Sequence, residues 1–144
     1  MKTLLHLAAA LLLALPAVKA QTVTGSLTTS SPMTSANNGG PLQYYFNAYA
    51  FEVTVPGTYM FLANSLFDSY GQLYSSDSFH FNYPEYDAIL FQDDSIGSNF
   101  GFQHYFAAGK YNLAVSTFNV GETGSYTVTA SGPATLTFNG AVLV

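Results

Sequence analysis

Apolar and polar residues alternate with a period of two along most of the chain after position 42, which is the pattern of β-strands. Between positions 43 and 55 both alternating sets are apolar at first, and one becomes polar later. This change is typical of a strand that runs from a core to a sheet edge. Pro56-Gly57 then predicts a turn, with Tyr59–Ala63 as the hairpin partner.

The rest of the chain repeats this style, with short apolar segments separated by Gly, Pro, Asn and Asp. The alternation slips near His104, which predicts a β-bulge. No segment after Ala20 has a helical period. The pattern predicts an all-β fold, a single antiparallel β-sandwich or jelly-roll-like domain, with a closed barrel as the alternative. The further expected strands are 70–74, 88–92, 100–106, 110–118, 125–131 and 135–144.

The first twenty residues have the features of a cleaved secretory signal peptide. Lys2 precedes an apolar run from Leu4 to Leu15, which is too short for the roughly 20 residues of a membrane span. Val18-Lys19-Ala20 places small residues where a signal peptidase requires them, so cleavage is expected before Gln21. We therefore expect a secreted, extracellular protein with no membrane span. Residues 21–41 form a Ser/Thr/Gly-rich lead with an edge strand, and 42–144 form the sandwich.

Composition narrows the function classes. The chain of 144 residues has three Lys and no Arg against eight acidic residues, and it has no Cys. Nucleic-acid binding needs clustered cations, and disulfide-stapled folds and thiolate metal sites need Cys, so all three are excluded. Aromatic residues make up 16% of the chain and charged residues 8%, where soluble domains usually carry about 25% charged residues. One apolar, acidic domain remains.

An ordered set of short motifs between positions 43 and 132 resembles the bacterial pre-peptidase C-terminal domain. The motifs are Phe51-Glu52-Val53 followed by Pro56-Gly57-Thr58-Tyr59, Phe67-Asp68-Ser69-Tyr70-Gly71-Gln72-Leu73-Tyr74, Gln92-Asp93-Asp94-Ser95, Ala108-Gly109-Lys110-Tyr111, and Gly121-Glu122-Thr123-Gly124-Ser125-Tyr126-Thr127-Val128. The resemblance implies a β-sandwich of the kind usually appended to secreted proteases and other exoenzymes. Gly71 departs from the family strand, which carries Leu at that position, and no protease domain accompanies this one.

Catalytic constellations are not evident, so no enzyme activity and no catalytic residue are expected. A Ser-His-acid site needs a nucleophile in a recognisable elbow, and no Gly-Xaa-Ser-Xaa-Gly occurs. His104 is interpreted as a strand histidine, and His80, among Phe79 and Phe81, as a packed or interface residue. A secreted hydrolase remains the remote alternative.

Acidic residues near strand ends suggest a calcium site. Ca²⁺ takes six to eight oxygen ligands from carboxylates and carbonyls. Asp93 and Asp94 are adjacent, and Asp68 begins another strand, so these three are the candidate ligands, with Glu85 and Asp87 as additions. The alternative is an ordinary turn at 93–97 in which Asp caps backbone amides. No cofactor is expected to be required, and Ca²⁺ is the one ion that the sequence suggests.

Aromatic residues in and beside the segment 75–87 suggest a ligand-binding surface, because Tyr offers an apolar face and a polar tip. The candidates are Tyr74, Phe79, Phe81, Tyr83 and Tyr86. The alternative is that these rings pack into the sandwich. The first functional hypothesis is a secreted, non-catalytic domain that binds an extracellular polysaccharide or protein and is stabilised by calcium. The second is a self-assembling filament or surface-layer subunit, a homo-oligomer joined through its terminal β-prone segments.

Overall fold

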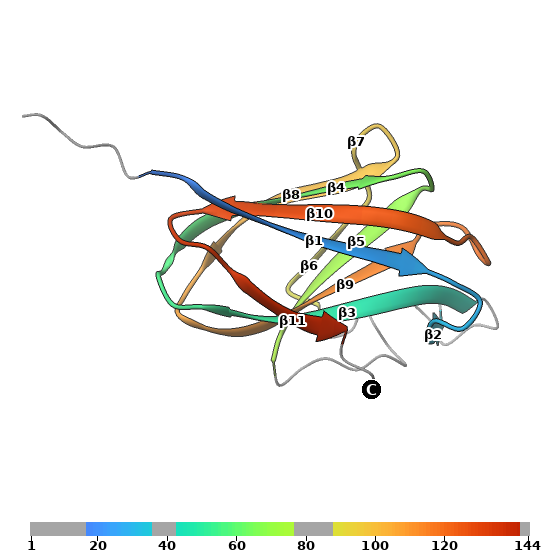
Figure 1. Cartoon of the computed structure of the whole chain (residues 1–144), viewed down its shortest axis with the longest axis horizontal. Helices are drawn as coiled ribbons and strands as arrows, with labels where there is room; N and C mark the ends of the chain where they lie inside the picture. The colour runs from blue at the N-terminus through green and yellow to red at the C-terminus, as the bar shows by residue number, and fades with distance from the viewer. Residues whose placement is uncertain (1–16, 36–42, 77–87, 142–144) are drawn as a thin grey trace, which may run out of the picture.

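The protein is a two-layer antiparallel β-sandwich (Figure 1). The structure, a computed structural model, describes residues 17–35, 43–76 and 88–141. Within these ranges every regular element is a strand, as the alternation predicts. None of these residues forms a helix that is long and apolar enough to span a bilayer.

The two sheets contain five and six strands, and the six include one short strand that lies off the main strand order. The first sheet has the order β1 (Lys19–Leu27), β10 (Gly124–Gly132), β4 (Gly57–Ser65), β8 (Asn99–Phe106) and β7 (Asp94–Ile96). The second sheet has the order β11 (Thr137–Ala141), β3 (Gln43–Val53), β9 (Gly109–Thr117), β5 (Ser69–Ser75) and β6 (Leu90–Gln92), while β2 (Met33–Ser35) pairs with β3.

The chain changes sheet at most of its turns, and this corrects one expectation. Pro56-Gly57 does not close a hairpin, because β3 belongs to the second sheet and β4 to the first. The rings of Phe51 and Phe61 instead meet across the core, with centroids 5.5 Å apart. Phe51 and Phe61 lie on apolar faces of their strands, and placing the strands in opposite layers buries these two faces against each other. The partners of these strands therefore come from distant parts of the chain.

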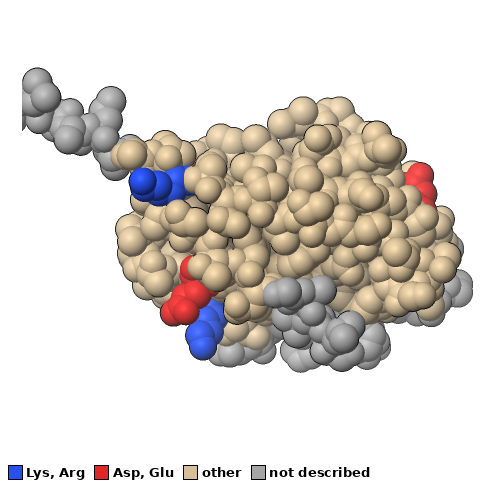
Figure 2. Space-filling view, in the orientation of Figure 1, with Lys and Arg blue, Asp and Glu red and all other residues tan. Residues whose placement is uncertain are grey.

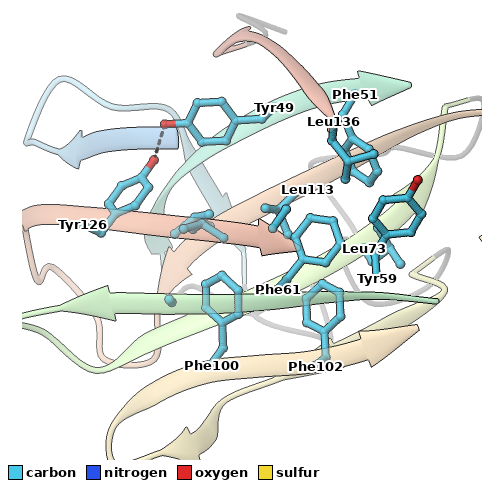
Figure 3. Packing of buried hydrophobic residues seen from close by; sticks show 14 of the residues in the cluster. Tyr49, Phe51, Tyr59, Phe61, Leu73, Phe100, Phe102, Leu113, Tyr126 and Leu136 are labelled. Atoms are coloured by element: carbon cyan, nitrogen blue, oxygen red, sulfur yellow. Dashed lines mark hydrogen bonds between the residues drawn. The ribbon is translucent and has the colours of Figure 1, made fainter. Parts of the chain in front are cut away.

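Aromatic rings from both sheets interlock in the core (Figure 3). Phe51 of β3 contacts Phe61 of β4 and Phe106 of β8 at centroid distances of 5.5 and 5.8 Å. Phe61 stacks on Phe102 at 5.0 Å. Tilted and edge-to-face ring pairs of this kind add stability beyond the area that they bury. A chain without cysteines is thus held together by a dense aromatic core.

Three glycines make room for aromatic residues of the core where an added Cβ would collide with them. Gly25 of β1 lies over the hydroxyl groups of Tyr49 and Tyr126, and Gly132 lies against the ring of Tyr59. Gly71 of β5 lies against the ring of Phe100. An aromatic ring that covers a strand glycine replaces the packing that the missing side chain would supply. These positions are therefore close approaches rather than turns.

Two further details test the sequence patterns. The pairing of β8 with β4 runs without a shift from Gly57↔Phe106 to Leu62↔Gly101, so the bulge predicted near His104 is wrong. His104 occupies an inward position between Phe102 and Phe106, and a polar residue there breaks the apolar alternation without breaking the register. In β3, neighbouring Ala48 and Tyr49 are both buried, which matches the two apolar faces expected early in that strand.

Candidate functional site

An exposed cluster of three aromatic rings lies at the β6 edge of the second sheet. Tyr70 of β5 lies between Phe91 of β6 and Phe118, with ring centroids 6.2 and 6.5 Å away. Phe91 is 52% exposed and Phe118 is 51% exposed. Single exposed apolar residues are common on protein surfaces, but rings in mutual contact form a continuous apolar platform.

The strand framework positions this aromatic cluster, which consists of Tyr70, Phe91 and Phe118. Gln72 pairs with Phe91, and Ser69 with Thr117, so β5 carries the neighbours of both outer rings. The amide of Phe118 donates to the carbonyl of Asp68 at 2.8 Å, which fixes the residue after β9 beside β5. The cluster therefore stands on backbone that is paired on both sides of β5.

A buried polar network anchors the start of β5 behind the cluster. The hydroxyl of Ser69 is fully buried and accepts from the amide of Phe100 at 3.1 Å. Oδ1 of Asn99 accepts from the amide and the hydroxyl of Ser65 at 2.8 and 2.7 Å. These bonds tie β4, β5 and β8 together, which favours a rigid support for the exposed rings.

Acidic side chains gather at the same end of the sandwich. Burial raises the pKa of Asp68 above its ordinary value of 3.8, and the charges of Asp94, Asp93 and Glu122 raise that pKa further. Oδ1 of Asp68 and Oε2 of Glu122 are both shielded from solvent and have no hydrogen-bond partner. This end of the molecule therefore carries negative charge that the described protein groups do not compensate.

The alternative to a calcium loop, an ordinary turn at 93–97, is correct only in part, because residues 94–96 form the short strand β7 and the chain turns at Gly97-Ser98. Oδ1 of Asp93 accepts from the amide of Asp94, and the carbonyl of Asp93 accepts from the amide of Ser95 at 2.6 Å. Gly97 adopts a φ of 62°, in the left-handed region that favours glycine. The Asp93 carboxylate thus accepts from the first amide of β7, while Oδ1 of Asp68 has no such partner.

The three predicted calcium ligands are near enough for their charges to interact, but they do not converge as a ligand set. Among the described residues, no three acidic or histidine side chains come close enough together to share one metal ion. The calcium site at Asp68, Asp93 and Asp94 stays a prediction, and Glu85 and Asp87 lie outside the described ranges. Glu122, which the sequence reasoning did not propose, belongs to the same electrostatic cluster.

Of the aromatic residues predicted to bind a ligand, only Tyr74 lies among the described residues. Tyr74 lies in β5 and is fully buried, so its ring presents no surface to a ligand in this structure. Phe79, Phe81, Tyr83 and Tyr86 lie outside the described residues. The sequence reasoning missed the cluster of Tyr70, Phe91 and Phe118, because its members lie in three separate segments of the chain. The available signal was that each is an aromatic residue at an outward position near a strand end.

His104, the one described candidate for catalysis, is a packed strand residue. Its ring meets the ring of Phe106 edge to face, with centroids 4.8 Å apart. Its strand pairs it with Tyr59 of β4. This surrounding agrees with the interpretation of His104 as a strand histidine, whereas His80 lies outside the described residues.

Comparison with known proteins identifies the fold. No family model matches the chain, and no curated protein matches it in sequence. Among solved structures, the pre-peptidase C-terminal domain of a collagenase from Bacillus anthracis superposes with a TM-score of 0.53 and 16% sequence identity. The match covers 76% of this chain and 87% of that one. The chain therefore has the fold of a pre-peptidase C-terminal domain, as the motif resemblance implied.

Proposed function

We propose that this protein is a secreted, non-catalytic binding domain that holds an extracellular polymer or protein through the exposed cluster of Tyr70, Phe91 and Phe118. The observation that carries the proposal is the contact between these rings on a rigid sheet edge. The fold supports it, since the similar collagenase domain is by its name an appendage of an enzyme that acts on an extracellular protein polymer.

The chemistry of the cluster suits polymers with flat apolar faces. Aromatic side chains lose little conformational freedom on binding and are enriched among residues that dominate binding energy. Sugar rings and the side chains of fibrous proteins both offer such faces. Of the described lysines, Lys110 lies at the opposite end of β9 from Phe118, and Lys19 lies on β1 of the other sheet, so stacking rather than ion pairing would supply the affinity.

The test is retention on insoluble polymers. The purified protein is mixed with cellulose, chitin, peptidoglycan, gelatin and fibrillar collagen, and the bound fraction is measured at several protein concentrations. Phe91→Ala and Phe118→Ala are each expected to weaken binding about tenfold, which corresponds to about 1.4 kcal/mol for each lost anchor. Tyr83→Ala and Phe81→Ala test the segment 77–87 in the same assay.

Tyr105→Ala is the matched control. Tyr105 is 64% exposed on β8 of the first sheet, away from the β6 edge, so its loss removes an exposed ring without touching the cluster. Binding by this variant is expected to equal that of the unmodified protein. Failure to bind any polymer, or equal loss in all variants, would contradict the proposal.

Calcium is the second element of the proposal, as a stabilising ion at the acidic end. The solvent-shielded, unpartnered oxygens of Asp68 and Glu122 support it, since carboxylate oxygens are ligands of Ca²⁺. The remaining ligands would be backbone carbonyls and water, because a third carboxylate does not converge there among the described residues. The melting temperature is expected to be higher in calcium than in EGTA, and Asp68→Asn is expected to abolish the difference. Equal melting temperatures would exclude a calcium role.

Export is the third element. Cleavage before Gln21 would leave a mature chain whose first residues belong to β1, where Gln21 pairs with Ala130. Mass spectrometry of the protein recovered from the medium of producing cells tests this directly. An intact N-terminus at Met1, or retention inside the cells, would refute it.

A further inference from the structure

The four sheet edges of the described sandwich differ in how well they are protected against pairing with another strand. β6 and β7 have three residues each, and the pairing of β7 with β8 shifts register. β11 has five residues and also contains a register shift. Short strands, irregular registers and charges are the usual means by which sheet edges avoid pairing with other chains. The edges at β6, β7 and β11 are therefore protected against pairing with another chain in the usual ways.

Of these protections β1 has only one, the charge of Lys19 near its start. Its nine residues pair with β10 in an unbroken register from Lys19↔Gly132 to Leu27↔Gly124. It contains no Pro, and its single charged residue is Lys19, which cleavage before Gln21 would remove. At the end of β1 the side-chain amide of Asn47 donates to the carbonyl of Ser26, and Leu27 is buried. The accessible part of this edge is thus its first two thirds.

The charge distribution favours a second copy of this chain as the partner. Figure 2, in the orientation of Figure 1, shows the side on which β1 and β11 lie. Outside the grey residues its charges gather toward the two ends. The acidic end lies far from the accessible part of β1, because Glu122 precedes Gly124, which pairs with Leu27 at the other end of the strand. Two acidic molecules can therefore approach along the start of β1 without opposing their carboxylate clusters.

We propose that two copies of this protein form a symmetric dimer in which the outer edges of β1 pair antiparallel across a two-fold axis. Antiparallel pairing of one strand with its own copy is self-complementary, as a two-fold interface requires. The outward side chains there, Thr22 and Thr24, are uncharged, so no like charges oppose each other across the pairing. The result is one continuous sheet formed from the five-stranded sheets of both copies.

This inference is independent of the proposed binding function and uses the other side of the molecule. The aromatic cluster stands at the β6 edge of the second sheet, whereas β1 ends the first sheet on the side of β11. A dimer through β1 therefore leaves both clusters open. It presents two binding surfaces to one polymer, which raises avidity without any new contact.

The test is the molar mass in solution, measured by light scattering up to millimolar concentration on protein produced from the full-length sequence, with its N-terminus defined by mass spectrometry. The unmodified protein is expected to reach twice the monomer mass. The double variant Thr22→Glu/Thr24→Glu places like charges on the paired edge. Its dissociation constant for the dimer is expected to rise on the order of tenfold or more.

Thr58→Glu/Gln103→Glu is the matched control. It adds the same charge at exposed positions in the middle of the first sheet, on β4 and β8, and is expected to dimerise like the unmodified protein. Circular dichroism and thermal unfolding verify that both variants fold. A strictly monomeric unmodified protein would overturn the inference, and so would a dimer that Thr22→Glu/Thr24→Glu leaves intact. Polymer binding by Phe91→Ala and Phe118→Ala is measured separately, so failure of one proposal does not imply failure of the other.

Discussion

The ring of Phe100 occupies the space that a side chain at Gly71 would fill. A Cβ built on Gly71 would lie 2.5 Å from Cδ2 of Phe100, closer than such atoms pack in proteins. Gly71 belongs to the second sheet and Phe100 to the first, so the pair joins the two layers. The family strand carries Leu where this chain has Gly71, and here a ring from the opposite sheet replaces that Leu.

Gly71→Leu is therefore expected to destabilise the protein, although it restores the residue typical of the family. A Leu side chain at position 71 and the ring of Phe100 cannot occupy the same space, and overpacking of this kind costs about 1–3 kcal/mol. Phe100→Ala is expected to cost about 3–5 kcal/mol through the cavity that it leaves. In the double variant Leu fills part of that cavity, so the two costs should not add. Urea denaturation of the four proteins measures this coupling.

Gly109→Ala is the control for glycine replacement. A Cβ at Gly109 would meet the ring of Tyr111 at 3.7 Å, which is ordinary contact. Its free energy of unfolding is expected to stay within about 0.5 kcal/mol of that of the unmodified protein. If Gly71→Leu were as stable as Gly109→Ala, the ring of Phe100 would not be replacing a side chain.

A second prediction concerns the hydroxyl pair between the sheets. Tyr49 and Tyr126 share a buried hydrogen bond of 2.6 Å (Figure 3). The side-chain amide of Asn47 donates to the Tyr126 hydroxyl at 2.8 Å. Tyr126→Phe removes the partner of the buried Tyr49 hydroxyl and one partner of the part-buried Asn47 amide, and is expected to cost about 1–3 kcal/mol. Tyr111→Phe, which loses an exposed bond to Ala107, should cost much less. Chemical denaturation compares them, and equal costs would contradict the prediction.

The same pair predicts a loss of stability at alkaline pH. Burial raises the pKa of Tyr126 well above its ordinary value of 10.0, and the hydrogen bond with Tyr49 raises it further. The folded protein therefore keeps a proton that the unfolded chain releases above about pH 10. The contribution of the Tyr126 hydroxyl to stability should be fully present below that pH and should fall as the pH rises beyond it. Thermal unfolding between pH 8 and 11 checks this, and Tyr126→Phe should flatten the decline.

The sequence was sufficient to predict what depends on local pattern. The alternation and turns of residues 43–132 identified the class of fold and most strands, because the period of side chains in a strand is short-range information. Strand partners were harder, since β3 pairs with β9 and not with the neighbouring β4. Pairing depends on which apolar faces meet across the core, and Phe51 and Phe61 reveal this only when folded.

In the candidate site, too, the sequence predicted what depends on local pattern and missed what depends on the path and pairing of the strands. Asp68, Asp93 and Asp94 could be grouped because the family resemblance implies that their loops share one end of the sandwich, and their charges do interact. Glu122 was not added to them, since its place depends on the path of the chain between β9 and β10. Tyr70, Phe91 and Phe118 come from three separate segments, and only the sheet order brings their rings together.

The last prediction follows from the raised pKa of Asp68. Burial is the largest cause of this rise, and the charges of Asp94, Asp93 and Glu122 raise the pKa further. The folded state then binds the Asp68 proton more tightly than the unfolded chain, whose value lies near 3.8. The favourable contribution of protonated Asp68 to the free energy of unfolding is thus present below pH 3.8, and it is lost as the pH rises through the pKa of Asp68 in the folded protein. At neutral pH in EGTA, Asp68→Asn should therefore raise the melting temperature, and below pH 3.8 the two proteins should converge.

Glu52→Gln makes the same change in charge at the opposite end of the sandwich, where Glu52 lies across from Lys110. It removes a favourable pairing of charges and should leave the melting temperature unchanged or lower it slightly. Measurements in excess calcium distinguish ion binding at Asp68 from simple electrostatic repulsion at that carboxylate. If the ion binds at Asp68, the unmodified protein gains stability and Asp68→Asn does not, so the order of the two melting temperatures narrows or reverses. Stabilisation by Asp68→Asn that is equal in calcium and EGTA would leave electrostatic repulsion as the whole effect of this carboxylate.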